Sequence, residues 1–254
     1  STRSDRMAFG LRWSGSGIFL ATEIRVQLHE WLAIVTGTLT PGALLIFVAI
    51  LAPELLPVTL VGTLVYSMFL IGQRVLNEAA YIRIDHKLNE LYHASPLSPE
   101  AYFVGIAGGM LVAYLPPSIV VLLILQLIHP LSLVAGLALL ACLLAVWAVS
   151  STIGYVVSTL FKDMKTIWPY SALLTNLFGI LPPVFYPLRL APIEWRSVVL
   201  VIPTSAAAVL VNAAAGLETL TSDEAILAAS ALALEAVALF VFGIYWARRT
   251  ARES

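Results

Sequence analysis

The chain has 254 residues, of which 60% are hydrophobic and only 11% are charged, and its mean hydropathy is +0.93. Soluble proteins average about 45–50% apolar and about 25% charged residues, so this composition excludes an ordinary soluble domain and indicates an integral membrane protein. The 14 Lys and Arg residues nearly balance the 15 Asp and Glu residues, which gives no electrostatic reason to expect nucleic acid as a partner. The single cysteine, Cys142, excludes an intrachain disulfide framework and a Cys-rich metal site.

The N-terminal region is predicted to hold an interfacial helix over residues 17–30. Apolar side chains recur there at helical spacing, with Arg25, Gln27 and Glu30 between them. A frayed extension is the alternative. No short apolar core followed by a small-residue cleavage site comes first, so we expect the first apolar run itself to direct membrane insertion.

Six apolar runs approach the roughly 20 residues that a helix needs to cross a bilayer. They cover about 31–51, 58–73, 102–128, 131–161, 167–182 and 225–247. The third run contains Pro116 and Pro117, so we expect it to be kinked. The sequence therefore predicts an all-α integral membrane fold with six transmembrane helices in a single transmembrane domain over residues 1–254.

Residues 183–224, between the fifth and sixth runs, contain apolar pieces that are each too short to cross the membrane. Pro187, Pro192 and Pro203 interrupt them. This pattern predicts a re-entrant hairpin at the outer mouth of the bundle, because such backbone at membrane depth needs other protein or a water-lined cavity around it. A surface loop with two interfacial helices is the alternative.

Basic residues are distributed very unevenly between the two sides of this six-helix plan. Only Arg189 and Arg196 fall on one side. The other side holds Arg3, Arg6, Arg12, Arg25, Arg74, Arg83, Lys87, Lys162, Lys165, Arg248, Arg249 and Arg252. Since Lys and Arg concentrate in cytoplasmic loops, both termini are predicted to face the cytoplasm.

The sequence has no motif for catalysis or for nucleotide binding. It lacks a G-x-x-x-x-G-K-[ST] loop, so ATP and Mg²⁺ would have to be bound by a partner, and we expect no cofactor in this chain. The histidines do not form a helical metal-binding pair, because His29, His86, His93 and His129 lie in different segments. Transport or structural roles are therefore favoured over enzymatic ones.

Glu235 is the ionisable residue that most clearly lies inside a predicted span. Charge at the bilayer centre costs about 2.5–3.5 kcal/mol on insertion scales, so such residues often mark transport pathways. A solitary one favours a structural or interface role, in the bundle interior or against a partner subunit. The scarcity of other interior charges disfavours an ion-coupled carrier.

The second cytoplasmic loop, residues 74–103, is predicted to contain a short amphipathic helix over residues 77–92. Its charges alternate with apolar residues such as Ile82 and Leu88, and the Ser-Pro-Leu-Ser-Pro turn at 95–99 ends it. This mixture indicates a helix that docks on another protein.

The residues of this loop resemble the permease subunits of type-2 ABC exporters. The resemblance lies in Glu78, then the Lys-Leu-Asn-Glu-Leu run at 87–91, the Ser-Pro-Leu-Ser turn at 95–98 and the small residues at 105–109. Residues 182–187 and the Pro203-Thr204 pair are also similar to the outer re-entrant region of that family. The six-span plan is similar over nearly the whole chain.

This resemblance implies a dimer of two permease chains, identical or homologous, with two separate cytoplasmic ATP-binding cassette subunits. The loop helix would then be the coupling helix that enters a cleft of each ATPase. The implied contact residues are Glu78, Arg83, Asp85, His86, Lys87, Glu90, Leu91 and Pro96. The pair His86-Lys87 departs from the Gly-Thr pair of many relatives. Lys162 and Lys165 would form either a second ATPase contact or an anchor at the lipid headgroups.

The predicted function is that of the transmembrane subunit of an ATP-driven exporter in the cytoplasmic membrane of a prokaryote. Its cargo would be hydrophobic or amphipathic: a drug, a lipid or a lipid-linked glycan. Candidate pathway residues, which could equally be packing residues, are Tyr66, Phe69, Tyr155, Tyr170 and Glu235. A motor-free secondary carrier or channel is the main alternative, and a lipid-modifying transferase is a third.

Overall fold

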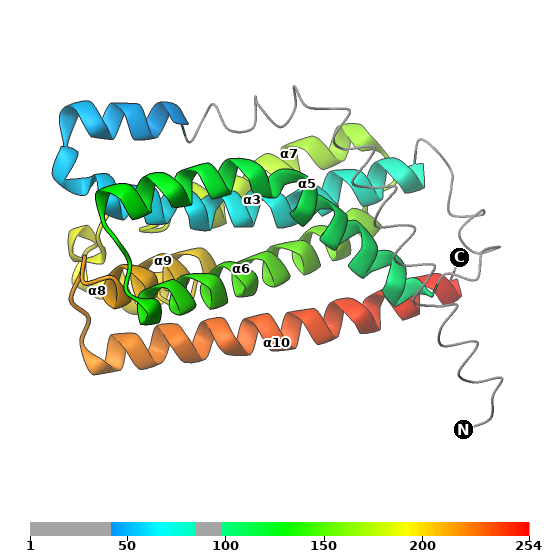
Figure 1. Cartoon of the computed structure of the whole chain (residues 1–254). Coiled ribbons are helices and arrows are strands. Elements are labelled where there is room, and N and C mark those ends of the chain that lie inside the picture. Colours follow the sequence, from blue (N-terminus) through cyan, green and yellow to red (C-terminus); the bar gives the residue numbers. More distant parts are fainter. Residues whose placement is uncertain (1–41, 85–97, 254) are drawn as a thin grey trace, which may run out of the picture.

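The computed structural model describes residues 42–84 and 98–253, and within these ranges all regular secondary structure is helical (Figure 1). The long helices are α3 (Leu56–Ile84), α5 (Pro99–Ile128), α6 (Leu133–Leu160) and α10 (Ser222–Glu253). The shorter ones are α7 (Met164–Thr175), α8 (Ile193–Val199) and α9 (Pro203–Ala214), together with η1 (Pro53–Leu55), the π-helix η2 (Asn176–Ile180) and η3 (Leu188–Leu190). A further apolar helix covers Gly42–Leu51.

Four helices in the described ranges are long and apolar enough to cross a membrane, namely α3 together with η1, α5, α6 and α10. The number rises to five if the bent pair α8 and α9 counts as one broken span. The structure confirms an all-helical fold with apolar helices that could span a membrane, which is compatible with a multi-pass membrane protein, whereas six crossings remain a prediction. Of the first predicted run only residues 42–51 are described, and the predicted interfacial helix at 17–30 lies outside the described residues.

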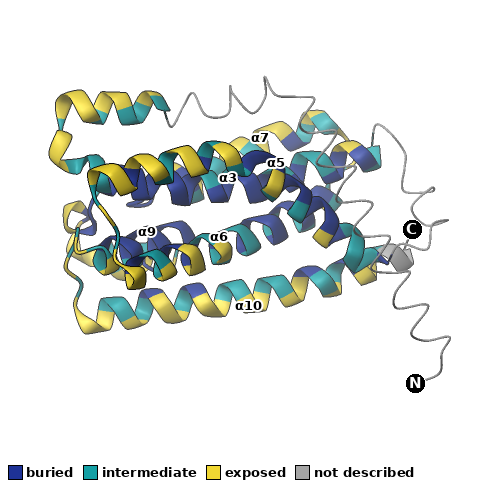
Figure 2. Cartoon of the chain, in the orientation of Figure 1, coloured by how far each residue is buried: buried dark blue, intermediate teal, exposed yellow. Residues whose placement is uncertain are grey.

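Helix α3 lies at the centre of the bundle. In its most apolar 18-residue window 72% of the residues are buried, against 11% for α10. Figure 2 shows the same contrast, with α3 and α9 mostly dark blue and α10 largely yellow and teal. The apolar surface of α10 therefore lies where lipid or a partner protein would cover it.

Glycines allow α3 and α6 to approach closely. A Cβ on Gly72 of α3 would lie 2.8 Å from the amide nitrogen of Ser151 in α6. A Cβ on Gly154 of α6 would lie 3.0 Å from the amide nitrogen of Leu76 in α3. Small residues at helix crossings are a common device for packing within membranes.

The helix ends are set by local capping side chains. The Asp163 carboxylate accepts from the amide of Thr166 at 2.8 Å at the start of α7, and the Ser98 and Ser132 hydroxyls cap α5 and α6 in the same way. At the end of α9, Gly216 has a φ of 72°, which lets the amide of Leu217 donate to the carbonyl of Asn212 at 2.9 Å.

The proline pair Pro116-Pro117 lies inside α5, which continues through it to Ile128. Figure 1 shows that α5 changes direction along its length, as expected for a helix that contains prolines.

The predicted end of the second span was wrong, because the helix is longer than we expected. We expected it to end near Gln73, with a separate amphipathic helix from residue 77, but α3 continues without a break to Ile84. The guanidinium of Arg74 lies 3.9 Å from the centre of the Tyr114 ring in α5, so this charge is accommodated on the helix surface. Buried Ala79, Ala80 and Ile82 extend the packed face further.

Helices α8 and α9 meet at an angle of 106° across a short break at residues 200–202. Such a bend belongs either to a broken span or to a re-entrant loop. In Figure 1 this pair lies at the end of the bundle opposite the C-terminus, beside the start of α10.

Candidate functional site

The candidate site is the end of the bundle at which α3 stops and the predicted coupling segment begins. We call it the Arg83 end and define it by Arg83, the last turn of α6 with Phe161, and the last turns of α10. Of the predicted ATPase-contact residues, Glu78 and Arg83 lie on α3. The other six, Asp85, His86, Lys87, Glu90, Leu91 and Pro96, lie outside the described residues.

Arg83 joins the end of α3 to the end of α6. Its guanidinium donates to the carbonyl oxygen of Ser158 and, at 2.5 Å, to the carbonyl oxygen of Phe161. The last carbonyls of a helix have no partner within the helix and carry partial negative charge, so a cation there satisfies both needs. Arg83 therefore acts as a side-chain cap for α6, supplied by a different helix.

Further polar contacts tie α10 to the same end of α6. The indole of Trp246 donates to the Thr159 hydroxyl at 2.9 Å, and Tyr155 is hydrogen-bonded to Thr250. An ion pair of 3.3 Å joins Arg248 of α10 to Glu100 at the start of α5, although Arg248 is largely exposed. Helices α3, α6 and α10 are thus linked at the Arg83 end by side chains.

The turn between α6 and α7 lies directly beside Arg83. Its residue Asp163 caps α7, and its hydrogen bonds to Thr166 lower the pKa of the Asp163 carboxyl. Lys162 and Lys165 flank it and are exposed. Both predicted roles for these lysines, a headgroup anchor and a second ATPase contact, are compatible with this exposure.

Side-chain hydrogen bonds of Gln73 also join α3 to α7. The side-chain amide of buried Gln73 donates to the carbonyl oxygen of Ser171 at 2.6 Å and accepts from the Thr175 hydroxyl at 2.9 Å. Thr175 is the last residue of α7 before the π-helix η2. The backbone of η2 is in turn held by the Thr204 hydroxyl of α9, which donates to the carbonyl oxygen of Phe178. We did not single out Gln73 in the sequence, although an amide in an apolar run is a usable signal.

Three of the predicted pathway aromatics pack inside the chain. Tyr66, Phe69 and Tyr155 are 5%, 3% and 6% exposed. Their ring partners are Phe185 at 5.4 Å, Phe178 at 6.3 Å and Phe103 at 4.9 Å. Such contacts are what core packing requires.

The other two candidates are more accessible. Tyr170 on α7 is 45% exposed and lies 4.5 Å from the ring of Phe161. Glu235 on α10 is half-buried, and its Oε2 atom has no hydrogen-bond partner among the described residues. The structure does not bring these five residues together into one site.

Ser158 and Phe161, which accept the hydrogen bonds of Arg83, were missed by sequence reasoning. The acceptors of Arg83 are backbone carbonyls of Ser158 and Phe161, and a backbone acceptor leaves no side-chain signal in the sequence.

Within residues 42–84 and 98–253, no group of three or more His, Cys, Asp or Glu residues could hold a metal ion. Comparison of the sequence with protein-family models and with curated proteins finds no match.

Proposed function

We propose that this chain is the transmembrane subunit of an ATP-driven exporter of the type-2 ABC class. It would work as a pair of permease chains, identical or homologous, with a cytoplasmic ATP-binding cassette subunit bound to each. ATP and Mg²⁺ are held by those subunits. The cargo is hydrophobic or amphipathic: a drug, a lipid or a lipid-linked glycan.

The observation that carries this proposal is the bond between Arg83 and the end of α6. The coupling segment follows α3 directly in the chain, and Arg83 lies on the last turn of α3. A force applied to that segment by an ATPase would therefore reach α3 and the α6–α7 turn together. ATP can shift the conformation of the permease only through contacts that differ between its two states. Coupling therefore requires that the segment bound by the ATPase be connected to the helices that move.

The apolar character of the bundle supports the proposed type of cargo. Helix α6 contains no charged residue, and the only one in α5 is Glu100 in its first turn. An ion-coupled carrier generally needs several interior charges, whereas a pathway for apolar molecules needs few.

The proposed topology has six crossings, with both termini in the cytoplasm of a prokaryote. The first crossing would run through residues 31–51 and the fifth through α7 and η2, which follow one another directly. The bent pair α8 and α9 would then be the outer re-entrant hairpin. The twelve Lys and Arg residues on the cytoplasmic side of this plan support the orientation.

The test is co-purification in mild detergent with the ATPase encoded beside this chain, followed by measurement of ATP hydrolysis and transport. Alanine replacements across Asp85 to Glu90 should weaken the complex or separate hydrolysis from transport. The control replaces Glu194 by alanine, since this carboxylate is exposed and lies on α8 at the opposite end of the bundle. Normal coupling after the Asp85 to Glu90 replacements would refute the proposed role of that segment.

The alternative is a motor-free secondary carrier or channel, and two residues favour it. Glu235 has a buried carboxylate oxygen without a partner among the described residues, and Arg74 lies on α3 more than two turns before its end. If no ATPase co-purifies and transport depends on a proton gradient and on Glu235, the carrier replaces the exporter.

A further inference from the structure

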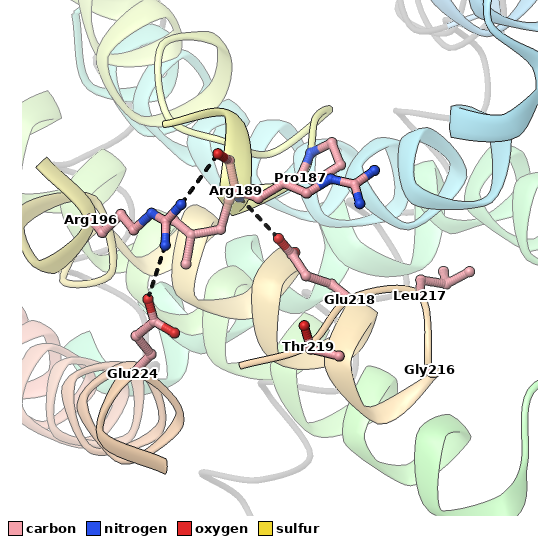
Figure 3. Close-up of a pocket in the computed structure, with 9 residues that line it drawn as sticks. Pro187, Arg189, Arg196, Gly216, Leu217, Glu218, Thr219 and Glu224 are labelled. Carbon is pink, nitrogen blue, oxygen red and sulfur yellow. Dashed lines mark hydrogen bonds and ion pairs between the residues drawn. The ribbon is translucent and has the colours of Figure 1, made fainter. Parts of the chain in front are cut away.

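A small pocket lies at the end of the bundle opposite Arg83, between η3, α8 and the turn that joins α9 to α10. Figure 3 shows its lining. Its volume is about 180 Å³, and its polar side chains are Arg189, Arg196, Glu218, Thr219 and Glu224. None of these residues has a role in the exporter mechanism proposed above.

One pair of charges in this pocket, Arg196 and Glu224, makes contacts within the protein. Arg196 lies 3.8 Å from the carboxylate of Glu224, and its guanidinium also donates to the carbonyl oxygens of Arg189 at 3.2 Å and Ala191 at 3.4 Å. The second carboxylate oxygen of Glu224 accepts from the Thr221 amide and hydroxyl at the start of α10. This pair therefore builds the wall of the pocket and leaves no net charge there.

The second pair of charges, Glu218 and Arg189, makes fewer side-chain contacts. One carboxylate oxygen of Glu218 accepts from the backbone amide of Arg189 at 3.3 Å, but Oε2 is buried without a partner among the described residues. The Arg189 guanidinium makes no close ion pair among the described residues, although its positive charge attracts the Glu218 carboxylate through space, and Figure 3 shows it turned away from Arg196, on the side of Pro187. The pocket thus presents a carboxylate and an exposed guanidinium that are not held together in a close ion pair among the described residues.

The surroundings of the pocket are those of a membrane interface. Leu190, Ile193 and Trp195, in η3 and α8, are exposed apolar side chains next to the pocket. Tryptophan with apolar neighbours at the end of a helical bundle is typical of headgroup depth. The pocket therefore opens where phospholipid headgroups would lie.

We propose that this pocket binds a zwitterion that carries one ammonium and one phosphate group. The ammonium pairs with the carboxylate of Glu218, which lines the pocket, and the phosphate accepts from the guanidinium of Arg189. A purely anionic ligand would leave the Glu218 oxygen unsatisfied and beside a like charge. Phosphatidylethanolamine in the surrounding leaflet and free phosphoethanolamine share this chemistry.

The experiment measures ligand binding to the purified full-length chain in detergent by native mass spectrometry. The probes are short-chain phosphatidylethanolamine, short-chain phosphatidylglycerol and free phosphoethanolamine. We expect the wild type to prefer phosphatidylethanolamine to phosphatidylglycerol. Glu218→Gln should weaken phosphatidylethanolamine binding about tenfold, because the ammonium partner is lost, and should strengthen phosphatidylglycerol binding, because a carboxylate that repels an anionic ligand is removed. Arg189→Gln should weaken the binding of both lipids.

The matched control is Glu194→Gln, which removes an exposed carboxylate of α8 at the same end but outside the pocket lining. It should bind like the wild type. Glu218→Asp keeps the charge and should bind more tightly than Glu218→Gln, which separates loss of the carboxylate from a folding defect. Competition by free phosphoethanolamine at similar concentrations would identify a soluble zwitterion as the ligand, and its failure to compete would identify the lipid. Equal binding of the two lipids, or unchanged phosphatidylethanolamine binding in Glu218→Gln, would overturn the proposal.

Discussion

Gly72 of α3 faces the backbone of Ser151 of α6 so closely that a Cβ on Gly72 would stand 2.8 Å from the Ser151 amide nitrogen. Gly154 of α6 gives a second close contact one turn further along α3, with a Cβ position 3.0 Å from the amide nitrogen of Leu76. The central helix of the bundle is therefore fixed against α6 by backbone contacts. Helical backbone cannot move aside as a flexible side chain can.

Gly72→Ala should destabilise the fold by about 1–3 kcal/mol, the usual cost of overpacking. The control is Gly136→Ala on α6, where a Cβ meets no atom within 4 Å and alanine improves helix propensity. The measurement is unfolding of the purified chain in detergent by added denaturant, followed by circular dichroism. Equal unfolding midpoints for the two variants would contradict the close packing of α3 and α6.

Gln73→Leu should cost only about 1 kcal/mol, although Gln73 makes two good hydrogen bonds to α7. Side-chain hydrogen bonds between membrane helices average about 0.6 kcal/mol, and when the Gln73 amide is lost the Thr175 hydroxyl can donate instead to the Ser171 carbonyl, which lies 2.9 Å away. The same unfolding measurement tests this value. Gln73→Ala, which adds a cavity, should cost more than Gln73→Leu.

Three of the helices were well predicted from hydropathy alone. The runs at 102–128, 131–161 and 225–247 correspond to α5, α6 and α10, because an apolar stretch of this length has few alternatives to a spanning helix. Their ends differ by a few residues, since the capping residues Ser98 and Thr221 lie outside the apolar runs or at their margin.

The end of α3 could not be predicted in this way. Hydropathy counts Arg74 as the end of an apolar run, whereas the structure places its guanidinium on the Tyr114 ring of another helix. That contact depends on tertiary packing between α3 and α5. Similarly, Arg83 was identified as a candidate residue from the sequence, but its partner, the carbonyl oxygen of Phe161, was not.

Arg83→Ala should reduce transport more than it reduces ATP hydrolysis in the proposed complex. Without the guanidinium, the carbonyls of Ser158 and Phe161 lose their cap, so movement of the coupling segment would no longer reach the α6–α7 turn. Arg83→Lys should recover only part of the coupling, since an ammonium is a point charge and cannot reproduce the planar fork of arginine.

The control for this prediction is Arg248→Ala, which removes an exposed ion pair at the same end of the bundle and should cost roughly 0–1 kcal/mol in stability. The quantity compared is the number of ATP molecules hydrolysed per cargo molecule in proteoliposomes. A normal ratio for Arg83→Ala would show that the bond to α6 has no part in coupling.

Glu218 should make the lipid-free protein more stable at mildly acidic pH than at neutral pH. Burial raises the pKa of its carboxyl, while the amides of Arg189 and Leu188 oppose that shift. Because the folded state binds this proton more tightly than the unfolded state, the stabilisation is complete below the unfolded pKa and is lost as the pH rises through the folded pKa. Glu218→Gln should therefore be more stable than the wild type at neutral pH and show a flatter pH profile in thermal unfolding. A profile that Glu218→Gln leaves unchanged would rule out Glu218 as the titrating group.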